Sequence, residues 1–202
     1  TAPFEFNHFQ AVAYEGLIWV IGSFKDNAYP NEAPADHIYM YNPVSDTWIQ
    51  GPAIPNARKR GSAGLVMYNN KFYVIAGNTI GHNGGYIPWF DEFDPATGKW
   101  TVLGDVPRAR DHFHATVVGS KLYVVGGRLT GGAGGTFAPV IPEVDVYDFT
   151  TGSWSTLPAS GNLPTPRAAS GTVTFNGKVV VIGGEGNGQA YAKTDALDVN
   201  TN

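Results

Sequence analysis

The sequence predicts an all-β fold made of one repeated unit of short antiparallel strands. Four segments resemble one another at a period of roughly 50 residues, and they lie at 8–22, 62–76, 112–126 and 169–183. Within them, β-branched and aromatic runs are separated by turns that use many of the 26 glycines and 14 prolines. Such a period is typical of units whose apolar face is buried only by neighbouring units, as in propellers and solenoids.

The composition supports a packed globular chain and excludes several classes of protein. Hydrophobic residues make up 43% of the sequence and charged residues 15%, which is enough apolar material for a core. A net charge of −4 disfavours nucleic-acid binding, since phosphate recognition needs a basic surface. The absence of cysteine excludes disulfides, thiol nucleophiles and Cys-ligated zinc. No apolar run approaches the roughly 20 residues of a membrane helix, so no membrane span is expected.

The first two strands of each unit are predicted from a hairpin pattern. In the third unit, an apolar run at 115–118 and a β-branched run at 121–125 flank the turn Gly119-Ser120. Two such runs around a short turn indicate antiparallel strands. The equivalent turns, which suit a positive φ, are Glu15-Gly16, Asn69-Asn70 and Asn176-Gly177.

A third and a fourth strand are predicted from a constant spacing. The third strands are expected to end at Asn42, Asp94 and Asp148, and a tryptophan follows each of them six residues later, as Trp48, Trp100 and Trp154. Because the tryptophans recur in frame, we expect them in the core between repeated units.

These residues together resemble the kelch repeat. The features that carry the resemblance are the double glycines Gly126-Gly127 and Gly183-Gly184, the Tyr147-Asp148 turn with Trp154 after it, and the segments Pro107-Arg108 and Pro166-Arg167. The resemblance covers essentially the whole chain and implies a β-propeller of four-stranded antiparallel blades. The repeats are placed at about 7–56, 57–107, 108–163 and 164–202.

The fourth repeat is expected to lack its outer strand. Asp198 stands where Asp148 stands in the third repeat, so the matching tryptophan would fall two residues past Asn202. Kelch propellers usually have six or seven blades, so the resemblance implies a segment of a larger ring. The remaining blades would come from missing sequence or from another chain, and a closed four-bladed ring is the least favoured alternative. An open arc is expected to expose an apolar blade face at each end.

A column of arginines is the first candidate ligand-binding site. Arg60, Arg110 and Arg167 occupy the same position in three of the repeats, and Phe6 occupies that position in the first repeat. In kelch adaptors that recognise acidic peptides and in kelch sugar isomerases, an arginine at this position of the repeat lines the axial pocket. The resemblance therefore implies a site for carboxylate or sulfate groups. The alternative is that each arginine holds a neighbouring loop or carbonyl. Arg58 and Arg108 are expected to be solvated.

Four long loops after the double-glycine positions are the second candidate, at 23–35, 78–88, 128–142 and 185–193. Long loops on a rigid scaffold commonly bind ligands. His82, Tyr86 and Trp89 lie in or beside them and are taken as ligand-binding residues, with simple loop packing as the alternative.

Histidines at the start of the first strand add a further candidate. His112 and His114 lie two residues apart, and alternation along a strand would put them on one side. His8 matches His112 in the first repeat. Such a pair allows a metal or acid–base role. In kelch repeats a histidine here is usually structural, so His112 is assigned to ligand binding, and we expect no metal and no cofactor.

The sequence favours a binding module that recognises a protein or carbohydrate ligand, with an anionic ligand as one option. The alternatives are a propeller enzyme acting on acidic sugars or polysaccharides, mutarotase-like or lyase-like, and a structural unit of an extracellular assembly. A copper radical oxidase is disfavoured because its tyrosine is crosslinked to a cysteine, and no pair of residues predicts catalysis. The start at Thr1 and the Gly/Thr/Asn-rich loops favour a secreted or cell-surface protein, with a cytoplasmic one as the alternative.

Overall fold

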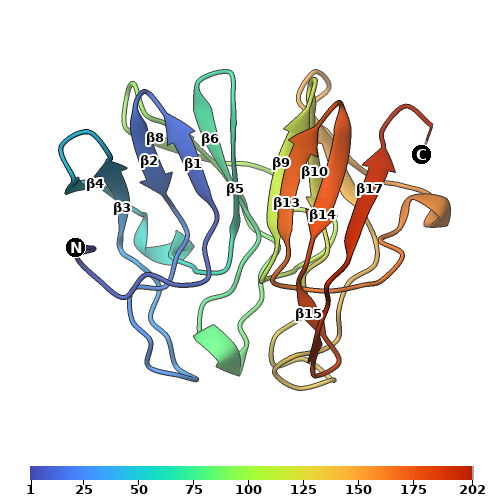
Figure 1. Cartoon of the computed structure of the whole chain (residues 1–202). Helices are drawn as coiled ribbons and strands as arrows, with labels where there is room; N and C mark the ends of the chain where they lie inside the picture. The colour runs from blue at the N-terminus through green and yellow to red at the C-terminus, as the bar shows by residue number, and fades with distance from the viewer. Residues whose placement is uncertain (202) are drawn as a thin grey trace.

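The computed structural model describes residues 1–201 and shows four antiparallel sheets around a common axis, which confirms the predicted β-propeller (Figure 1). Within each sheet the strands follow one another in chain order. The first blade contains β1 (Ala11–Tyr14), β2 (Leu17–Val20), β3 (His37–Asn42) and β4 (Thr47–Ala53). The second contains β5 (Gly64–Tyr68), β6 (Lys71–Ile75), β7 (Phe90–Asp94) and β8 (Lys99–Val102).

The last two blades differ in their number of strands. The third contains β9 (His114–Val118), β10 (Lys121–Val125), β11 (Asp145–Asp148) and β12 (Ser153–Thr156). The fourth has three strands, β13 (Gly171–Phe175), β14 (Lys178–Ile182) and β17 (Thr194–Asp198), so within the described residues it lacks the outer strand, as expected. A small hairpin of β15 (Glu185–Gly186) and β16 (Gln189–Ala190) extends from it.

Helical structure is limited to short 3-10 turns in the described part of the chain. They are η1 (Asn56–Arg58), η2 (Gly81–Asn83) and η3 (Ala159–Gly161). No helix among residues 1–201 has the length and apolar character that crossing a membrane would require.

Local turn chemistry and register follow the sequence pattern. The hairpin turns at Glu15-Gly16, Asn69-Asn70 and Asn176-Gly177 all have positive φ. The tryptophans face the aromatic residues of the third strands, in the pairs Tyr41–Trp48, Phe93–Trp100 and Tyr147–Trp154. The spacing therefore identified the fourth strand correctly in three repeats.

The core lies between blades. Trp100 packs with Trp19 and Phe72 in the cluster that joins the first and second blades. Trp154 packs against Phe90 in the cluster that joins the second and third. Trp100 and Trp154 therefore each face the preceding blade, whereas within the described residues no blade precedes that of Trp48. The expectation that Trp48 lies between blades is wrong, because it packs on the outer face of the first blade beside Phe6.

The two ends of the arc are covered differently. At the first blade, Phe4 and Phe6 of the N-terminal segment pack edgewise or tilted on Tyr39, with ring centroids 5.5 and 5.0 Å away. The expectation of an uncovered face there is wrong, because the chain folds back over it. At the fourth blade, Val173, Phe175 and Ile182 are 47%, 65% and 48% exposed. That sheet face is open within the described residues, as expected.

One side chain near the axis links three blades. Gln10 precedes β1, and its amide oxygen accepts hydrogen bonds from the backbone N–H groups of Leu65 and Ala115 at 3.0 and 2.9 Å. Its amide nitrogen donates to the carbonyl of Ala115 at 2.8 Å. The inner strands β1, β5 and β9 are thereby held at fixed positions. The long loops extend from one end of the molecule, and the β1–β2, β5–β6, β9–β10 and β13–β14 hairpin turns lie at the other (Figure 1).

Candidate functional site

The mouth of the axis on the loop side is formed by one residue from each repeat. His8, Ser62, His112 and Ala169 occupy equivalent positions just before the inner strands, and their φ angles are 48°, 53°, 52° and 51°. The last three each donate their backbone N–H to the carbonyl of the preceding member, with Ser62 to His8 at 2.8 Å, His112 to Ser62 at 3.2 Å, and Ala169 to His112 at 2.6 Å. A left-handed backbone is uncommon for residues other than glycine, and such positions concentrate at functional sites.

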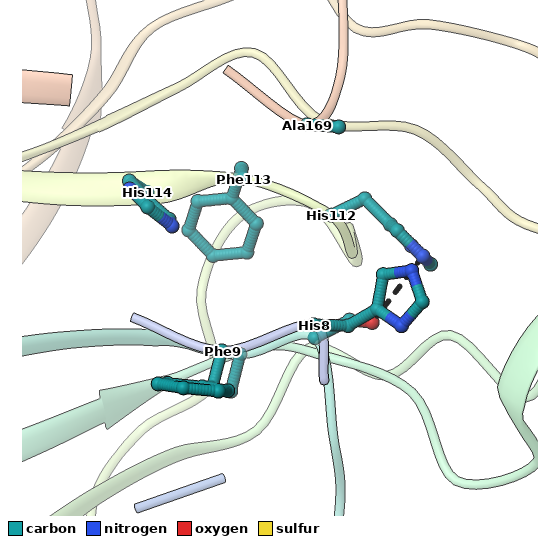
Figure 2. A pocket seen from close by; sticks show the side chains of 8 residues that line it. His8, Phe9, His112, Phe113, His114 and Ala169 are labelled. Atoms are coloured by element: carbon teal, nitrogen blue, oxygen red, sulfur yellow. Dashed lines mark hydrogen bonds between the residues drawn. The ribbon is translucent and has the colours of Figure 1, made fainter. Parts of the chain in front are cut away.

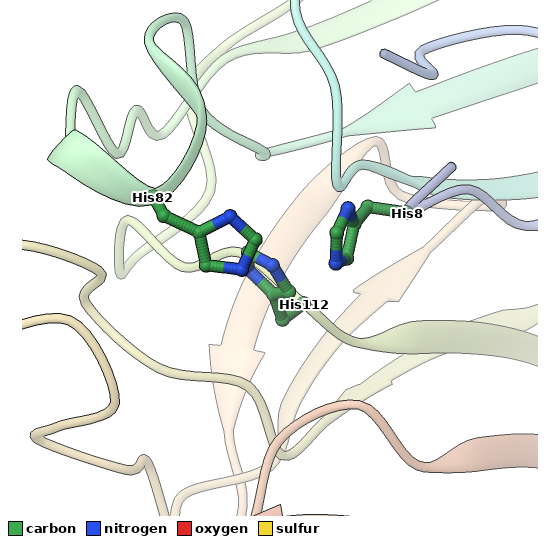
Figure 3. A group of neighbouring side chains, drawn as sticks. All are labelled: His8, His82 and His112. Atoms are coloured by element: carbon green, nitrogen blue, oxygen red, sulfur yellow. The ribbon is translucent and has the colours of Figure 1, made fainter. Parts of the chain in front are cut away.

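Three histidines from different repeats and loops meet at this mouth (Figure 3). The ring centroids of His8 and His112 are 4.6 Å apart, those of His8 and His82 are 4.9 Å apart, and those of His82 and His112 are 5.3 Å apart. One nitrogen atom from each ring lies within 4.8 Å of the other two. His82 reaches the group from η2 in the 78–88 loop. We call these residues the histidine cluster.

Each ring of the histidine cluster is oriented by an oxygen acceptor at Nδ1. The partners are Asn7 Oδ1 for His8 at 2.6 Å, Glu32 Oε1 for His82 at 2.5 Å, and Asp111 Oδ1 for His112 at 2.5 Å. Ionised carboxylates only accept hydrogen bonds, so Nδ1 of His82 and His112 must carry the proton. In the neutral ring, Nε2 is then left with a free lone pair.

Burial keeps two rings of the cluster, those of His8 and His112, uncharged at neutral pH. Burial and the neighbouring His112 and His82 lower the pKa of His8 to about 4. Burial also lowers the pKa of His112, although the hydrogen bond to Asp111 opposes that effect. Burial acts to raise the pKa of Glu32, but hydrogen bonds from its own backbone and from His82 outweigh it and leave that pKa below its usual value. The site thus combines neutral imidazoles with an ionised carboxylate.

A cavity of about 200 Å³ borders the histidine cluster (Figure 2). It is lined by His8, Phe9, Ser62, Ala63, His112, Phe113, His114 and Ala169. His114 lies apart from His8 and His112 in this view. The predicted pairing of His112 with His114 is wrong, because β9 begins only at His114 and the left-handed backbone of His112 breaks the alternation of the strand.

Aromatic side chains surround the cluster on the loop side. The rings of Tyr29 and Phe137 have centroids 4.9 and 6.3 Å from that of His82, and these two residues are 62% and 44% exposed. The guanidinium of Arg128 lies 5.0 Å from the centre of the Phe137 ring. Ile80 and Tyr86 are two further exposed apolar side chains, and they come from the 78–88 loop that also carries His82.

The arginine column does not contribute to this mouth. Arg60, Arg110 and Arg167 are at most 1% exposed. Arg60 donates to the carbonyls of Ala76 and Val74 at 2.8 and 2.9 Å, and it pairs with Asp91 at 2.8 Å. Arg110 pairs with Asp145 and Arg167 with Asp195 in the same manner, at 2.6 and 2.7 Å. This geometry matches the alternative in which each arginine holds neighbouring carbonyls, and it provides no support for binding of an anionic ligand.

Two further predicted positions serve the same framework. Trp89 stacks under the guanidinium of Arg58, 4.4 Å from the ring centre, and Arg58 forms a forked pair with Asp91. Arg108 pairs with Asp145 and donates to Thr156 at 3.1 Å. The expectation that Arg58 and Arg108 are solvated is wrong, because each shares an aspartate with an arginine of the column. Tyr86 is 39% exposed and lines a separate surface cavity beside Arg108.

Of the seven predicted ligand-binding residues, only His82 and His112 meet in the histidine cluster. Glu32, Asp111 and Arg128 were missed. Asp111 directly precedes His112 in the sequence, and this adjacency is the one signal that could have found it. Asn78 and Arg128 each keep a buried side-chain nitrogen without a hydrogen-bond partner among residues 1–201. Unpaired buried polar atoms are uncommon and mark places where water or a ligand binds.

Comparison with known proteins extends the kelch resemblance. A family model described as the KLHDC2/KLHL20/DRC7 kelch-repeats domain matches residues 8–202. The chain is 27% identical to the kelch-like protein terF of Aspergillus terreus, over 99% of this chain and 44% of that protein. It is 25% identical to kelch-like protein 41a of Danio rerio, over 97% of this chain and 31% of that protein. The chain therefore spans less than half the length of these curated relatives.

A solved structure shows the same fold. The structure of YjhT superimposes with a TM-score of 0.67 over 96% of this chain and 82% of that chain, at 16% sequence identity. At this identity the similarity establishes the propeller fold alone.

Proposed function

Because the chain belongs to the kelch-repeat family, we propose that it is a binding module that holds a protein ligand at the loop end of the propeller axis. Kelch repeats form a module typical of protein–protein interaction. The finer parts of the proposal are the nature of the ligand and the place where it binds. The following observations on the loop end support them.

The observation that carries the proposal is a group of exposed apolar side chains on the loops at this end of the propeller. Tyr29 and Phe137 lie beside His82 at the axial mouth, and Ile80 and Tyr86 come from the loop between theirs. The four side chains are between 39% and 62% exposed. Tyrosine and other aromatic residues are enriched at protein interfaces, where a few of them supply most of the binding energy. Loops held by a rigid scaffold are the usual place for such contacts.

The polar groups at the mouth complete the binding surface. His82 lies against Tyr29 and Phe137, and its neighbours His8 and His112 line the cavity of about 200 Å³. A partner loop with one inserted side chain matches this combination of an apolar rim and a small central hollow. The guanidinium groups of the arginine column are already paired with aspartate side chains, so the ligand need not be anionic.

A carbohydrate ligand remains the competing possibility, since exposed aromatic rings also stack on sugar faces. The test uses two probes, a displayed random-peptide library and a glycan array, against the immobilised protein. Two double variants are compared with the wild type, Tyr29→Ala with Phe137→Ala at the loop end, and Val44→Ala with Phe175→Ala at the hairpin-turn end. Val44 and Phe175 are 93% and 65% exposed, so they are matched controls.

We expect enriched peptides to bind the wild type and the hairpin-turn variant equally, and to bind the loop-end variant about 10- to 30-fold more weakly, the loss expected of an aromatic anchor. Enrichment of glycans alone would favour the carbohydrate alternative and overturn the proposal. Peptides that bind the loop-end variant as tightly as the wild type would also overturn it.

A further inference from the structure

We propose that His8, His82 and His112 bind a divalent transition-metal ion through their Nε2 atoms, with Zn²⁺ as the reference ion. This inference goes beyond the proposed binding function and does not rest on it. No sequence pattern predicted the site, because its three ligands come from two repeat positions and one loop.

The donor set fits such an ion. Imidazole nitrogen is a preferred ligand of zinc, copper and nickel, and sites with three protein ligands leave one position open. Within residues 1–201, the Nε2 atoms of His8 and His82 make no hydrogen bond, and that of His112 has only a long contact of 3.5 Å to Ser62 Oγ. The Nε2 lone pairs of these three neighbouring rings are the feature that a metal ion would satisfy (Figure 3).

The second layer of residues is arranged as in metal sites. A metal-bound histidine almost always donates its other ring N–H to a carboxylate, a carbonyl or water, which fixes the tautomer and the ring orientation. All three rings have such an acceptor here, namely Asn7 Oδ1, Glu32 Oε1 and Asp111 Oδ1. The three rings, oriented in this way, each offer a nitrogen atom within 4.8 Å of the other two.

The distances require a small adjustment. The donor nitrogens lie within 4.8 Å of one another. A tetrahedral zinc site with Zn–N bonds of about 2.1 Å needs nitrogens about 3.4 Å apart. His8 is the least buried of the three rings, so we expect it to be the one that moves toward the other two.

The local charge also favours a cation. Glu32 and Asp111 contact the cluster directly, and Glu185 pairs with Arg128 at 2.5 Å. Three carboxylates against one guanidinium leave a net negative charge to compensate a divalent ion in a poorly solvated place. Because His8 and His112 also line the cavity, the fourth coordination position would face that cavity and be open to water or to a ligand atom.

The test is a metal titration of protein that has been treated with a chelator. Zn²⁺ is titrated by calorimetry at neutral pH, and Co²⁺ is used as a spectroscopic probe whose visible absorption reports a low-symmetry nitrogen site. The test variants are His8→Gln, His82→Ala and Glu32→Gln. The matched control is His114→Gln, because His114 lines the same cavity without belonging to the cluster.

We expect one ion per chain in the wild type and in His114→Gln. Loss of a direct ligand in His8→Gln or His82→Ala should weaken binding by more than the roughly 10- to 100-fold expected when a second-layer residue such as Glu32 is changed. Glu32→Gln should keep the stoichiometry and lose affinity within that range.

Absence of stoichiometric Zn²⁺ or Co²⁺ binding by the wild type would overturn the proposal. Equal losses in His114→Gln and His82→Ala would do the same, since they would place the ion elsewhere. Circular dichroism of each metal-free variant checks its folding. If a variant does not fold, the NMR signals of the histidine rings in the wild type are measured with bound Co²⁺, which broadens the signals of nearby protons. Broadening that spares the rings of the histidine cluster would contradict the proposed site.

Discussion

Glu32 accepts hydrogen bonds from both Nδ1 and the backbone N–H of His82, at 2.5 and 3.0 Å, across a separation of 50 residues. These two bonds join the loop of the first blade to the loop of the second. Both residues are buried, so the pair holds the loop end of the propeller in one conformation.

Removal of this link should loosen the loop end. Glu32→Ala leaves two buried donors without their acceptor, and we expect the free energy of unfolding to fall by about 1–3 kcal/mol. Chemical denaturation measures this loss, and hydrogen exchange should show faster exchange in residues 78–88. Glu5→Ala, at an exposed position, is the control and should change stability little. An unchanged exchange rate in 78–88 would mean that the link does not order the loop.

The arginine column should act as a structural element. Arg110→Ala removes one of the two arginines that pair with the buried Asp145, and the loss of one partner of a buried pair typically costs about 3–5 kcal/mol. Burial lowers the pKa of Arg110 to about 10 despite the opposing effect of Asp145, so the guanidinium is charged at neutral pH. Lys178→Ala is the control, since the side chains of its ion pair with Asp198 are 49% and 35% exposed and the change should cost about 1 kcal/mol or less. Equal stability of the two variants would show that Arg110 has no structural role.

The frame tryptophans should differ in their contribution. Trp100 lies between two blades, and Trp100→Ala should lower the free energy of unfolding by about 3–5 kcal/mol through the cavity that it leaves. Trp48→Ala should cost clearly less, because Trp48 packs on the outer face of the first blade under Phe6 and not between two blades. Urea titration of both variants measures the difference. A loss below about 1 kcal/mol for Trp100→Ala would contradict its place in the interblade core.

The open face of the fourth blade should make the chain self-associate. Phe175 and Ile182 expose apolar surface on one sheet face, and large patches of this kind are rare on soluble monomers. We expect residues 1–202 to bind an apolar dye and to associate in sedimentation, and Phe175→Ser with Ile182→Ser to reduce both. Val44→Ser, at a 93% exposed turn position, should leave both unchanged. A wild-type chain that is monomeric and does not bind the dye would contradict this prediction.

Stability should fall as the pH is lowered through the range where histidine titrates. The pKa of His8 is about 4 in the folded chain and 6.5 in the reference state, so between these values the unfolded chain binds more protons. The contribution of His8 to the free energy of unfolding is therefore complete above about pH 6.5 and is lost as the pH drops toward 4. The groups that face His8 are His112, His82, Glu32 and Arg128.

Thermal unfolding of the metal-free protein at about pH 5 and about pH 7 measures this effect. His8→Gln should show a smaller difference between the two midpoints than the wild type does. A midpoint for the wild type that rises toward pH 5 would contradict the assigned direction.

The repeat frame could be predicted from the sequence because its signals are local. The turns at Asn69-Asn70 and Asn176-Gly177 use residues that tolerate positive φ, and Trp100 and Trp154 follow their third strands at a constant spacing. Each of these features depends on the conformation of a few neighbouring residues. Four copies of the same local pattern then determine a propeller, since each blade can bury its apolar face only against another blade.

The partners of the buried side chains were decided only in the tertiary structure. The sequence shows that Arg60, Arg110 and Arg167 occupy equivalent positions in their repeats. The carbonyls and aspartates that they bind, however, lie on later strands of their blades. Trp48 has the same local signal as Trp100, yet it packs on an outer face because no described blade precedes it.

The candidate site depends on tertiary structure most of all. His8 and His112 are equivalent by repeat, whereas His82 comes from a loop without periodicity, and its position is set by Glu32 from another loop. Loop conformation depends on contacts between residues far apart in the chain, and no local propensity encodes those contacts. The sequence by itself therefore determined the blades and their order, and only the folded chain brought three histidines to one point.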